Sequence, residues 1–256
     1  MKFITTNDIF LLEEIVKRNF SSKYKDSVLG IFWSVLKPLL IMALFTILFS
    51  TIFSRNIENY PVYFLSGKCI YDFFAAGVGL SMFAIKGNSA ILQRTPAPKY
   101  IFILGSIISE FFNFLITLGI LVCVMIVTGA TFYWSIVLLA IFPIISLLAL
   151  ITGLGFILSI TCVYYSDIQH LWSVFVQMLM YASAVFFPMS IIPEPYHQYL
   201  ILNPIYWIIN QFRMIIYHGI IPNITYMCNS LLLSVIILLL GIIIYKKYEK
   251  TVTMKF

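Results

Sequence analysis

Charge is scarce in this chain. Charged residues make up 10% of the sequence, whereas soluble domains contain about 25%. Hydrophobic residues make up 61%, and the mean hydropathy is +0.99. This composition excludes a soluble globular domain and predicts an integral membrane protein. The apolar segments do not alternate with polar residues as the strands of a membrane barrel do, so the predicted fold class is all-α.

The sequence also lacks the motifs of common catalytic centres. The only Gly-Lys pair, Gly67-Lys68, has no preceding phosphate-loop glycine and lies within an apolar segment. There is no HExxH or GxSxG motif, and the 4 cysteines have no CxxC or CxxH spacing. We therefore predict no catalytic residue, no metal site and no cofactor bound by this chain. A partner or an ion gradient must supply the free energy for any work against a gradient.

Six apolar segments are long enough to cross the roughly 30 Å core of a bilayer. They are Val28–Phe53, Pro61–Ile85, Tyr100–Thr128, Phe132–Tyr164, Ile168–Ile192 and Met227–Tyr245. Most of the 16 lysines and arginines lie in residues 1–29, 86–99 and 246–256. The positive-inside rule therefore places these three segments and both termini in the cytoplasm. The net charge of +6 reflects this topology and anionic lipid headgroups, so we do not interpret it as nucleic-acid binding.

This topology divides the chain into three parts. Residues 1–29 form a cytoplasmic amphipathic arm, residues 30–245 a six-helix transmembrane domain, and residues 246–256 a basic cytoplasmic tail. The transmembrane domain contains a cytoplasmic loop at 86–99 and a large outer segment at 188–223.

Two cytoplasmic elements have the character of short surface helices. Residues 5–20 place apolar side chains on one helical face and charged side chains on the other, and this helix is too short to span a membrane. The apolar face carries Ile9, Leu12, Val16 and Phe20, and the charged face carries Glu13, Glu14, Lys17 and Arg18. In the loop 86–99, Asn88 or Ser89 can cap a helix through Arg94, which Pro96 prevents from continuing. Each element is either a plain surface feature or a docking element for a soluble partner.

Aromatic residues make up 17% of the chain and form stripes on two predicted spans. In the first span, Phe45, Phe49 and Phe53 recur every four residues, with Phe32 and Trp33 at the inner end; in the fifth, Trp172, Phe175, Leu179 and Phe186 share a face. Such stripes pack against lipid or neighbouring helices, or they offer stacking surfaces to sugar rings.

Four charged residues fall within the apolar segments. Lys68 and Asp72 are spaced i,i+4, which favours a mutual ion pair over a substrate contact. Glu110 needs a cation or a proton, and Lys37 and Lys68 are both possible partners. Lys37 itself has no assigned partner.

Two further patterns predict local structure. Asn203-Pro204 starts and Gly219 stops a short outer helix, which is interfacial or re-entrant because it cannot span. The fourth span is rich in small residues that suit close helix packing. These are Ser146, Ala149, Gly153, Gly155 and Ser159.

Several motifs resemble those of the permeases of ABC polysaccharide exporters, the membrane subunits for export of O-antigen, teichoic acid or capsule. The opening of the first span, KYKDSVLGIFWSVLKPLL at residues 23–40, is the most specific of them. The resemblance continues in NSAILQRTPAPKYIF, in YYSDIQHLW and in the LNP segment of the outer region, and so covers nearly the whole chain.

The resemblance implies a homodimer in the bacterial cytoplasmic membrane, working with two copies of a cytoplasmic ABC ATPase that binds Mg-ATP. The cargo would be an undecaprenyl-linked glycan, with O-antigen favoured. The first and fifth spans would line the channel with Phe32, Trp33, Phe45, Phe49, Phe53, Trp172, Phe175 and Phe186. Contacts to the ATPase would come from Glu13, Lys17 and Arg18 of the arm and from a coupling helix with Asn88, Ser89, Ile91, Leu92, Gln93 and Arg94.

Two positions depart from the family pattern. Ser166 stands where an arginine commonly precedes Asp167, and Thr95-Pro96-Ala97 replaces an aromatic-Pro-basic sequence. Contacts that depend on those residues are therefore not carried over. The alternatives are a permease for small hydrophobic drugs or lipids on a related fold, and an ion-coupled flippase for lipid-linked sugars.

Overall fold

A computed structural model of the chain describes residues 6–25, 27–53, 57–95, 97–189, 193–197, 200, 203–252 and 255. Within these residues the regular elements are helices, which confirms the all-α fold class. In chain order they are α1 (Thr6–Tyr24), α2 (Trp33–Phe53), α3 (Tyr60–Phe83), α4 (Ser89–Arg94), α5 (Lys99–Val127), α6 (Ile141–Tyr164), α7 (Ile168–Ala182), α9 (Pro204–Ile216) and α10 (Ile224–Val252). Short 3-10 turns include η1 (Gly30–Phe32), η2 (Lys86–Asn88), η3 (Val137–Ala140) and η5 (Glu194–Tyr196).

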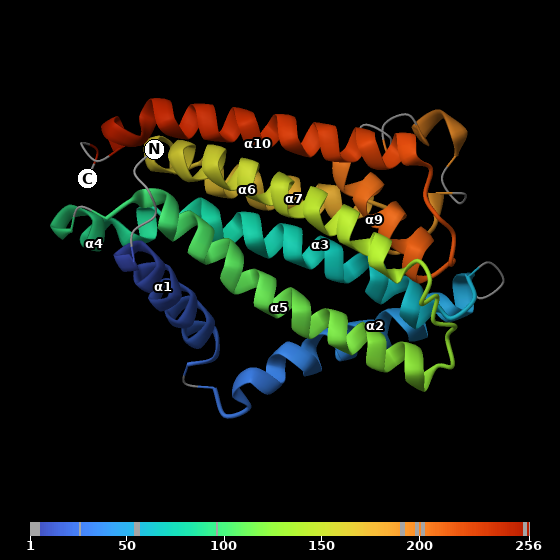
Figure 1. The fold of residues 1–256 in the computed structure, drawn as a ribbon. Coiled ribbons are helices and arrows are strands. Elements are labelled where there is room, and N and C mark those ends of the chain that lie inside the picture. Colours follow the sequence, from blue (N-terminus) through green and yellow to red (C-terminus); the bar gives the residue numbers. More distant parts are fainter. Residues whose placement is uncertain are drawn as a thin grey trace.

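The long helices α3, α5, α6 and α10 run side by side in one bundle, with both termini and α4 at the same end (Figure 1). Buried side chains of α3, α5, α6 and α9 form the core, and α3 is the most deeply enclosed of the long helices. α1 lies against α5 at the end that carries the termini.

The number of membrane spans differs from the six predicted. In the described residues, four stretches are long and apolar enough to cross a membrane: Gly30–Phe49, Lys99–Val127, Val137–Tyr164 and Ile224–Val252. α3 and α4 add a fifth if they count as one span bent by 46°. α7 has 15 residues and is too short alone, because a helix of that length reaches about 22 Å. The six-span count is therefore not confirmed.

α6 and α10 approach each other to backbone contact, as the small residues of the fourth predicted span indicated. A Cβ atom at Gly153 would lie 2.7 Å from the backbone of Ile237, and one at Gly241 would lie 2.4 Å from the Gly153 carbonyl oxygen. Gly155 lies similarly close to Ser81 of α3, with 2.6 Å between the hypothetical Cβ and Oγ. The predicted close packing is confirmed at both glycines.

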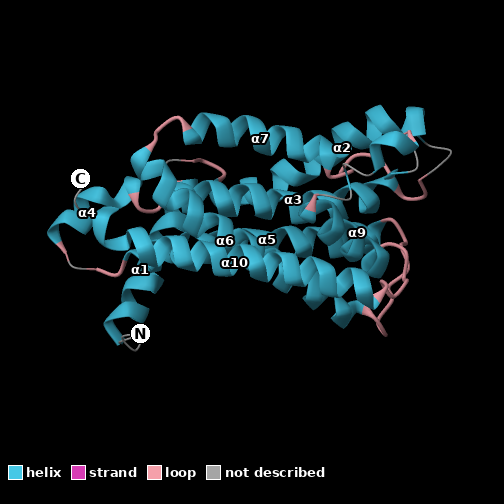
Figure 2. Cartoon of the chain, turned by 90° about the horizontal axis from the view of Figure 1, so that it is seen from above, coloured by secondary structure: helices cyan, strands magenta, loops and turns pink. Residues whose placement is uncertain are grey.

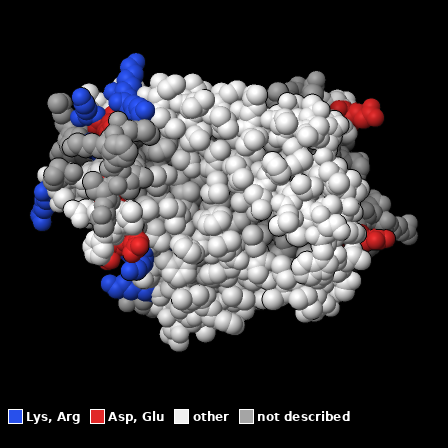
Figure 3. All heavy atoms as spheres, in the orientation of Figure 1, with Lys and Arg blue, Asp and Glu red and all other residues white. Residues whose placement is uncertain are grey.

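α2 and α7 lie along one side of the bundle when it is seen from above (Figure 2). No described side chain of α7 is buried, and the apolar stretch of α2 is also unburied. The face in Figure 3 shows no charged side chain across its middle, with Lys and Arg gathered at the end that holds α1 and α4. Acidic side chains appear at both ends in that view.

Candidate functional site

α1 and α4 are tied together at the charged end of the bundle. Arg18 of α1 donates from Nη2 to Oδ1 of Asn88 at 2.7 Å, and Asn88 donates from Nδ2 to the carbonyl oxygen of Ala84 at 2.7 Å. Asn88 stands at the N-cap of α4, as predicted, but its side chain makes no capping hydrogen bond because it is engaged elsewhere. The short helix through Arg94 is confirmed.

The residues predicted to contact an ATPase divide into buried and exposed groups. Leu92 is buried against the core and fastens α4 to the bundle, and Ser89 is half-buried. The exposed members are Glu13, Lys17, Arg18, Ile91, Gln93 and Arg94. They form two short exposed surfaces, joined by the Arg18–Asn88 hydrogen bond. Their predicted contact with a partner remains a prediction.

α1 packs on α5 through Ile15, which is 3% exposed and sits against Gly105. A Cβ atom at Gly105 would lie 2.7 Å from Cγ2 of Ile15, so the glycine permits this close contact. The predicted apolar face is only partly correct, because Leu12 faces α5 whereas Ile9 is exposed. The buried stripe is therefore rotated toward Ile15.

Glu110 of α5 is paired with Lys23 of α1, at 3.0 Å between Oε2 and Nζ. This corrects the expectation that Lys37 or Lys68 would be its partner. Lys23 was counted with the cytoplasmic arm, but α1 continues to Tyr24 and so carries Lys23 onto the middle of α5. The cation thus comes from outside the apolar segments.

A polar chain extends from this ion pair to α2. Asn113 donates from Nδ2 to Oε2 of Glu110 at 3.1 Å, and accepts at Oδ1 from the Tyr24 hydroxyl at 2.9 Å. The Tyr24 hydroxyl also contacts the Ser34 hydroxyl in a short hydrogen bond. The end of α1 is therefore joined to both α5 and α2 by side-chain hydrogen bonds.

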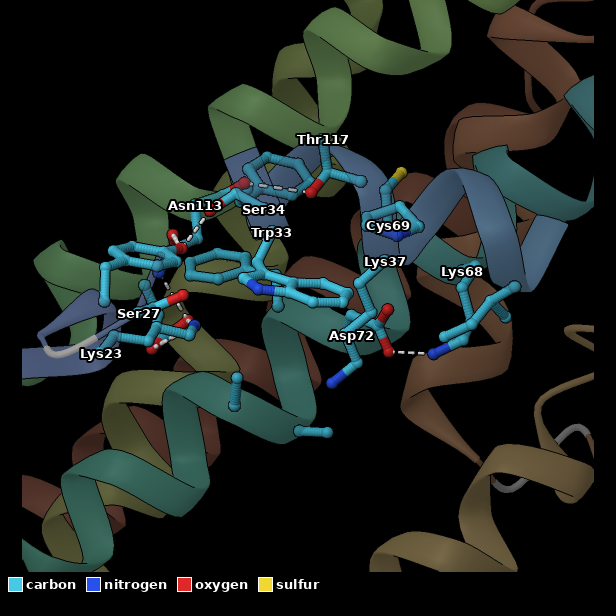
Figure 4. A pocket seen from close by; sticks show the side chains of 18 residues that line it. Lys23, Ser27, Trp33, Ser34, Lys37, Lys68, Cys69, Asp72, Asn113 and Thr117 are labelled. Carbon is cyan, nitrogen blue, oxygen red and sulfur yellow. Dashed lines mark hydrogen bonds and ion pairs between the residues drawn. The ribbon is translucent and has the colours of Figure 1, made fainter. Parts of the chain in front are cut away.

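A cavity of about 430 Å³ opens beside this chain, between α1, α2, α3 and α5 (Figure 4). Apolar and aromatic side chains form part of its wall, including Trp33, Phe73 and Phe114. Its polar lining residues are Lys23, Tyr24, Ser27, Ser34, Lys37, Lys68, Asp72, Glu110, Asn113 and Thr117, and Cys69 also contributes. All four charged residues that the sequence places within apolar segments thus lie on one cavity.

The charges in this cavity are unequally matched. Lys68 donates to Asp72 in a short i,i+4 ion pair, which confirms the predicted pairing. Lys23 is paired with Glu110. Lys37 has no hydrogen bond or ion pair with any described residue, and Figure 4 shows it beside Lys68 and Asp72. The cavity therefore contains one ammonium group more than its carboxylates neutralise.

Three of the predicted channel-lining aromatics belong to one cluster inside the bundle. Phe45 lies 4.8 Å from Phe186 and 5.7 Å from Phe49 between ring centroids, and all three pack against Phe64 or Tyr60 of α3. Phe186 is 4% exposed.

The other predicted channel residues are more accessible. Phe32, Trp33 and Phe175 are 55%, 44% and 49% exposed, and Trp172 is half-buried against Phe74 and Phe175. The side chain of Phe53 lies outside the described residues. The channel-lining role of all eight aromatics stays a prediction.

Arg213 of α9 is a buried residue that no sequence pattern marks as special. Its guanidinium donates to the carbonyl oxygens of Ala184 and Val185, each at 2.6 Å, and to the Tyr63 hydroxyl at 2.9 Å. It also lies 3.8 Å from the centroid of the Tyr63 ring. Gly67 leaves room for it, because a Cβ atom there would lie 2.2 Å from Nη2.

The short helix predicted between Asn203 and Gly219 is confirmed as α9, and its place on the outer side of the membrane stays a prediction. The Asn203 side chain accepts from the backbone nitrogen of Ile205 at 3.0 Å, and Gly219 follows the helix with a φ of +68°. Burial lowers the pKa of His218 just beyond α9, and the charge of Arg213 lowers this pKa further. Because Gln211 and Arg213 are buried, the polar side of α9 faces the bundle and not water.

Sequence reasoning missed Lys23, Tyr24 and Asn113 as parts of the site. Asn113 could have been noticed, because it lies one helical turn after Glu110 and carries an amide into an apolar segment. Lys23 and Tyr24 carried no such signal, since their partners are 87 and 89 residues away.

The family profile described as "ABC-2 type transporter" matches residues 11–217. The chain therefore belongs to the ABC-2 type transporter family. The match includes α1 after its first turn, the cavity and all of α9.

Several characterised proteins are similar along most of their length. The chain is 26% identical over 243 residues to the O-antigen export system permease protein RfbA of Klebsiella pneumoniae, covering 93% of this chain and 92% of that protein. It is 27% identical over 217 residues to RfbA of Myxococcus xanthus, covering 83% and 82%. It is 21% identical over 241 residues to the polysialic acid transport protein KpsM of Escherichia coli, covering 93% of each. The resemblance drawn from the sequence motifs is confirmed.

Proposed function

We propose that this chain is the membrane permease of an ABC exporter that moves a lipid-linked polysaccharide across the bacterial cytoplasmic membrane. O-antigen on an undecaprenyl carrier is the favoured cargo. The observation that carries this proposal is the full-length similarity to O-antigen export permeases. Its membership of the ABC-2 type transporter family implies an ATPase subunit as a partner.

The cytoplasmic surface of α1 and α4 supports the contact with that ATPase. α4 is short, stiff and fastened by Leu92, while Ile91, Gln93 and Arg94 face outward. The Arg18–Asn88 hydrogen bond holds α1 and α4 together, so that a push on either element moves both. Two ATPase copies with Mg-ATP would close against this surface and change the conformation of the permease.

The uncovered side of α2 and α7 supports a second copy of this chain. Gln177 lies in α7, is exposed, and has no hydrogen-bond partner among the described residues. An amide facing lipid is costly, whereas an amide facing a partner copy or a hydrated path is satisfied. The residues that follow α7 would complete the membrane crossing that this helix begins, so each copy would contribute six spans. The helices α2 and α7 of both copies would enclose the glycan path.

Aromatic side chains at the cavity end of α2 support a carbohydrate cargo. Phe32 and Trp33 are exposed at the start of α2, the helix that lies with α7 along one side of the bundle (Figure 2). Sugar rings stack on such surfaces through their C–H faces while their hydroxyl groups keep other hydrogen bonds. These contacts are tolerant of sliding, which suits a polymer that passes through.

Reconstitution tests the proposed function. Proteoliposomes containing the chain with its cognate ATPase should translocate lipid-linked glycan when ATP is supplied, and those containing either protein alone should not. Ile91→Asp, on the exposed face of α4, should abolish translocation while the protein stays in the membrane. The matched control Lys246→Gln, on the exposed tail of α10, should translocate at the normal rate.

Three results would contradict the proposal. ATP hydrolysis by the chain alone would show that the energy source lies within it. Glycan transport driven by an ion gradient without the ATPase would identify an ion-coupled flippase instead, and ATP-driven movement of hydrophobic drugs but not glycan would identify a drug or lipid permease.

A further inference from the structure

We propose that the cavity between α1, α2, α3 and α5 binds the phosphate-bearing head group of a lipid, and that Lys37 makes the principal contact with the phosphate. The favoured occupant is the diphosphate of the polyprenyl carrier, and this choice rests on the proposed function. The alternative source of the same chemistry is the phosphate of an anionic phospholipid.

The charge balance of the cavity carries the proposal. Two of its three ammonium groups have carboxylate partners, Lys23 with Glu110 and Lys68 with Asp72. Lys37 has none among the described residues. An ammonium group in an apolar segment is costly unless it reaches water or an anion. The excess positive charge of the cavity therefore favours the binding of an anion.

The position of Lys37 suits a ligand that arrives from the membrane. It lies in the second turn of α2, whose start is exposed, and Lys68 and Asp72 stand next to it across the cavity (Figure 4). The ion pair of Lys68 and Asp72 can rearrange when an anion enters, because Asp72 competes with the ligand for Lys68. Phosphate would thus contact Lys37 first and share Lys68 with the carboxylate.

The rest of the lining matches a phosphate joined to a sugar. Trp33 offers an aromatic surface, and Ser27 and Thr117 offer hydroxyl groups. A volume of about 430 Å³ lies within the roughly 300–1,000 Å³ range of small-molecule sites. The combination of one free cation, neutral hydrogen-bonding groups and an aromatic wall favours a glycosyl diphosphate over a bare inorganic ion.

Binding measured on the full chain in nanodiscs, without ATPase or ATP, tests this site. Undecaprenyl diphosphate is the probe, and native mass spectrometry gives its affinity. Lys37→Gln should weaken binding roughly tenfold or more, the loss expected for one charge-assisted hydrogen bond, while Lys37→Arg should bind nearly normally. Asp72→Asn should strengthen binding because it frees Lys68 for the ligand. A misfolded variant cannot produce that gain.

Three comparisons decide the outcome. Undecaprenol, which lacks phosphate, should bind all variants equally, and Lys246→Gln should bind the diphosphate like the wild type. The same dependence on Lys37 with phosphatidylglycerol in place of the diphosphate would support the site and assign it to membrane phospholipid. Unchanged diphosphate binding in Lys37→Gln, or weaker binding in Asp72→Asn, would overturn the proposal.

The binding and export assays can fail independently. Diphosphate binding that depends on Lys37, in a protein that does not export glycan with its ATPase, would leave the site and refute the proposed function. Normal glycan export, together with diphosphate binding that is unchanged in Lys37→Gln, would support the proposed function and refute the proposed site.

Discussion

Arg213 is a buried cation whose described partners are carbonyl oxygens and a tyrosine, with no carboxylate among them. It lies in α9 and donates to the two carbonyl oxygens that follow the C-cap residue Ser183 of α7, so its charge meets the partial negative charge of buried backbone oxygens. The planar guanidinium reaches two successive carbonyls while stacking on the Tyr63 ring. A lysine could not make both contacts at once in this way, since its ammonium group is a compact point charge and lacks the planar fork of the guanidinium.

Replacement of Arg213 should destabilise the fold. Arg213→Gln and Arg213→Lys should each lower the free energy of unfolding by about 3 kcal/mol, because buried carbonyl oxygens lose their donors. An SDS titration of the purified protein in mixed micelles measures this change. Arg94→Gln, which alters an exposed arginine, should stay within about 0.5 kcal/mol of the wild type. Equal stability of the Arg213 and Arg94 variants would show that the hydrogen bonds donated by Arg213 are dispensable.

Ion pairs in this chain were predictable only when the partners were near in sequence. Lys68 and Asp72 are one helical turn apart, so helix geometry alone brings them together. Glu110 meets Lys23 across 87 residues, and this contact depends on how far α1 extends and where it crosses α5. Neither quantity is encoded in local spacing, which is why the sequence indicated only Lys37 and Lys68 as possible partners of Glu110.

α6 and α10 form the closest helix pair of the bundle because two glycines meet there. Gly153 and Gly241 face each other, and either one would bring a side-chain carbon within 2.7 Å of the opposing backbone. Without a hydrophobic driving force between helices in lipid, such close backbone approach supplies much of the packing energy.

Enlarging Gly153 should separate these two helices. Gly153→Val should lower the free energy of unfolding by about 2 kcal/mol, since the added methyl groups overlap the α10 backbone. Gly119→Ala is the matched control: its Cβ would meet nothing within 4 Å, so the change should be neutral or stabilise by about 0.5 kcal/mol. Both are measured in the same SDS titration. A Gly153→Val protein as stable as the wild type would mean that the helices separate without cost.

Helix ends were predictable where the signal is local. α4 follows Asn88 and α9 follows Asn203, as the capping residues and prolines indicated. The end of α7 was not, because the predicted span ran to residue 192 while the helix stops at Ala182. There the Asn203 side chain donates to the Ala182 carbonyl oxygen at 3.2 Å, and Arg213 takes the carbonyls that follow. Hydrogen bonds from α9 thus replace those of another helical turn.

Charge is distributed unevenly between the two ends of the molecule, and this asymmetry predicts its orientation in the membrane. Lysines and arginines gather at the end with α1 and α4, while the opposite end, where Asn59 donates to Thr128 at 2.8 Å, shows acidic residues in Figure 3. The positive-inside rule assigns the first end to the cytoplasm. Both termini lie at that end in Figure 1, so the chain should cross the membrane an even number of times.

Reporter fusions test this topology. Green fluorescent protein at the C-terminus should fluoresce, and alkaline phosphatase inserted after Gly129 should be active, since the phosphatase folds only outside the cytoplasm. Alkaline phosphatase inserted after Thr95 should be inactive and serves as the control. An active insertion at Thr95 with an inactive one at Gly129 would invert the orientation and remove α4 from any cytoplasmic partner.

The sequence was sufficient for the membrane class, the helical fold and the basic end, because these depend on composition and on runs of apolar residues. It was insufficient for the cavity, which four helices build from residues as distant as Lys23 and Thr117. It also could not show that Phe45 and Phe186 share one cluster, since that contact follows from the placement of α2 beside the segment after α7.

The pairing of Lys23 with Glu110 also bears on how the protein is made. α1 leaves the ribosome first, but its ion-pair partner on α5 is synthesised 87 residues later. At about 5–20 residues per second this delay is roughly 4–17 s. Throughout that interval the apolar face of α1 cannot pack against α5, because α5 has not yet been made. The nascent chain must therefore hold α1 at the membrane surface or on a chaperone until α5 has been inserted, and only then can the cavity close.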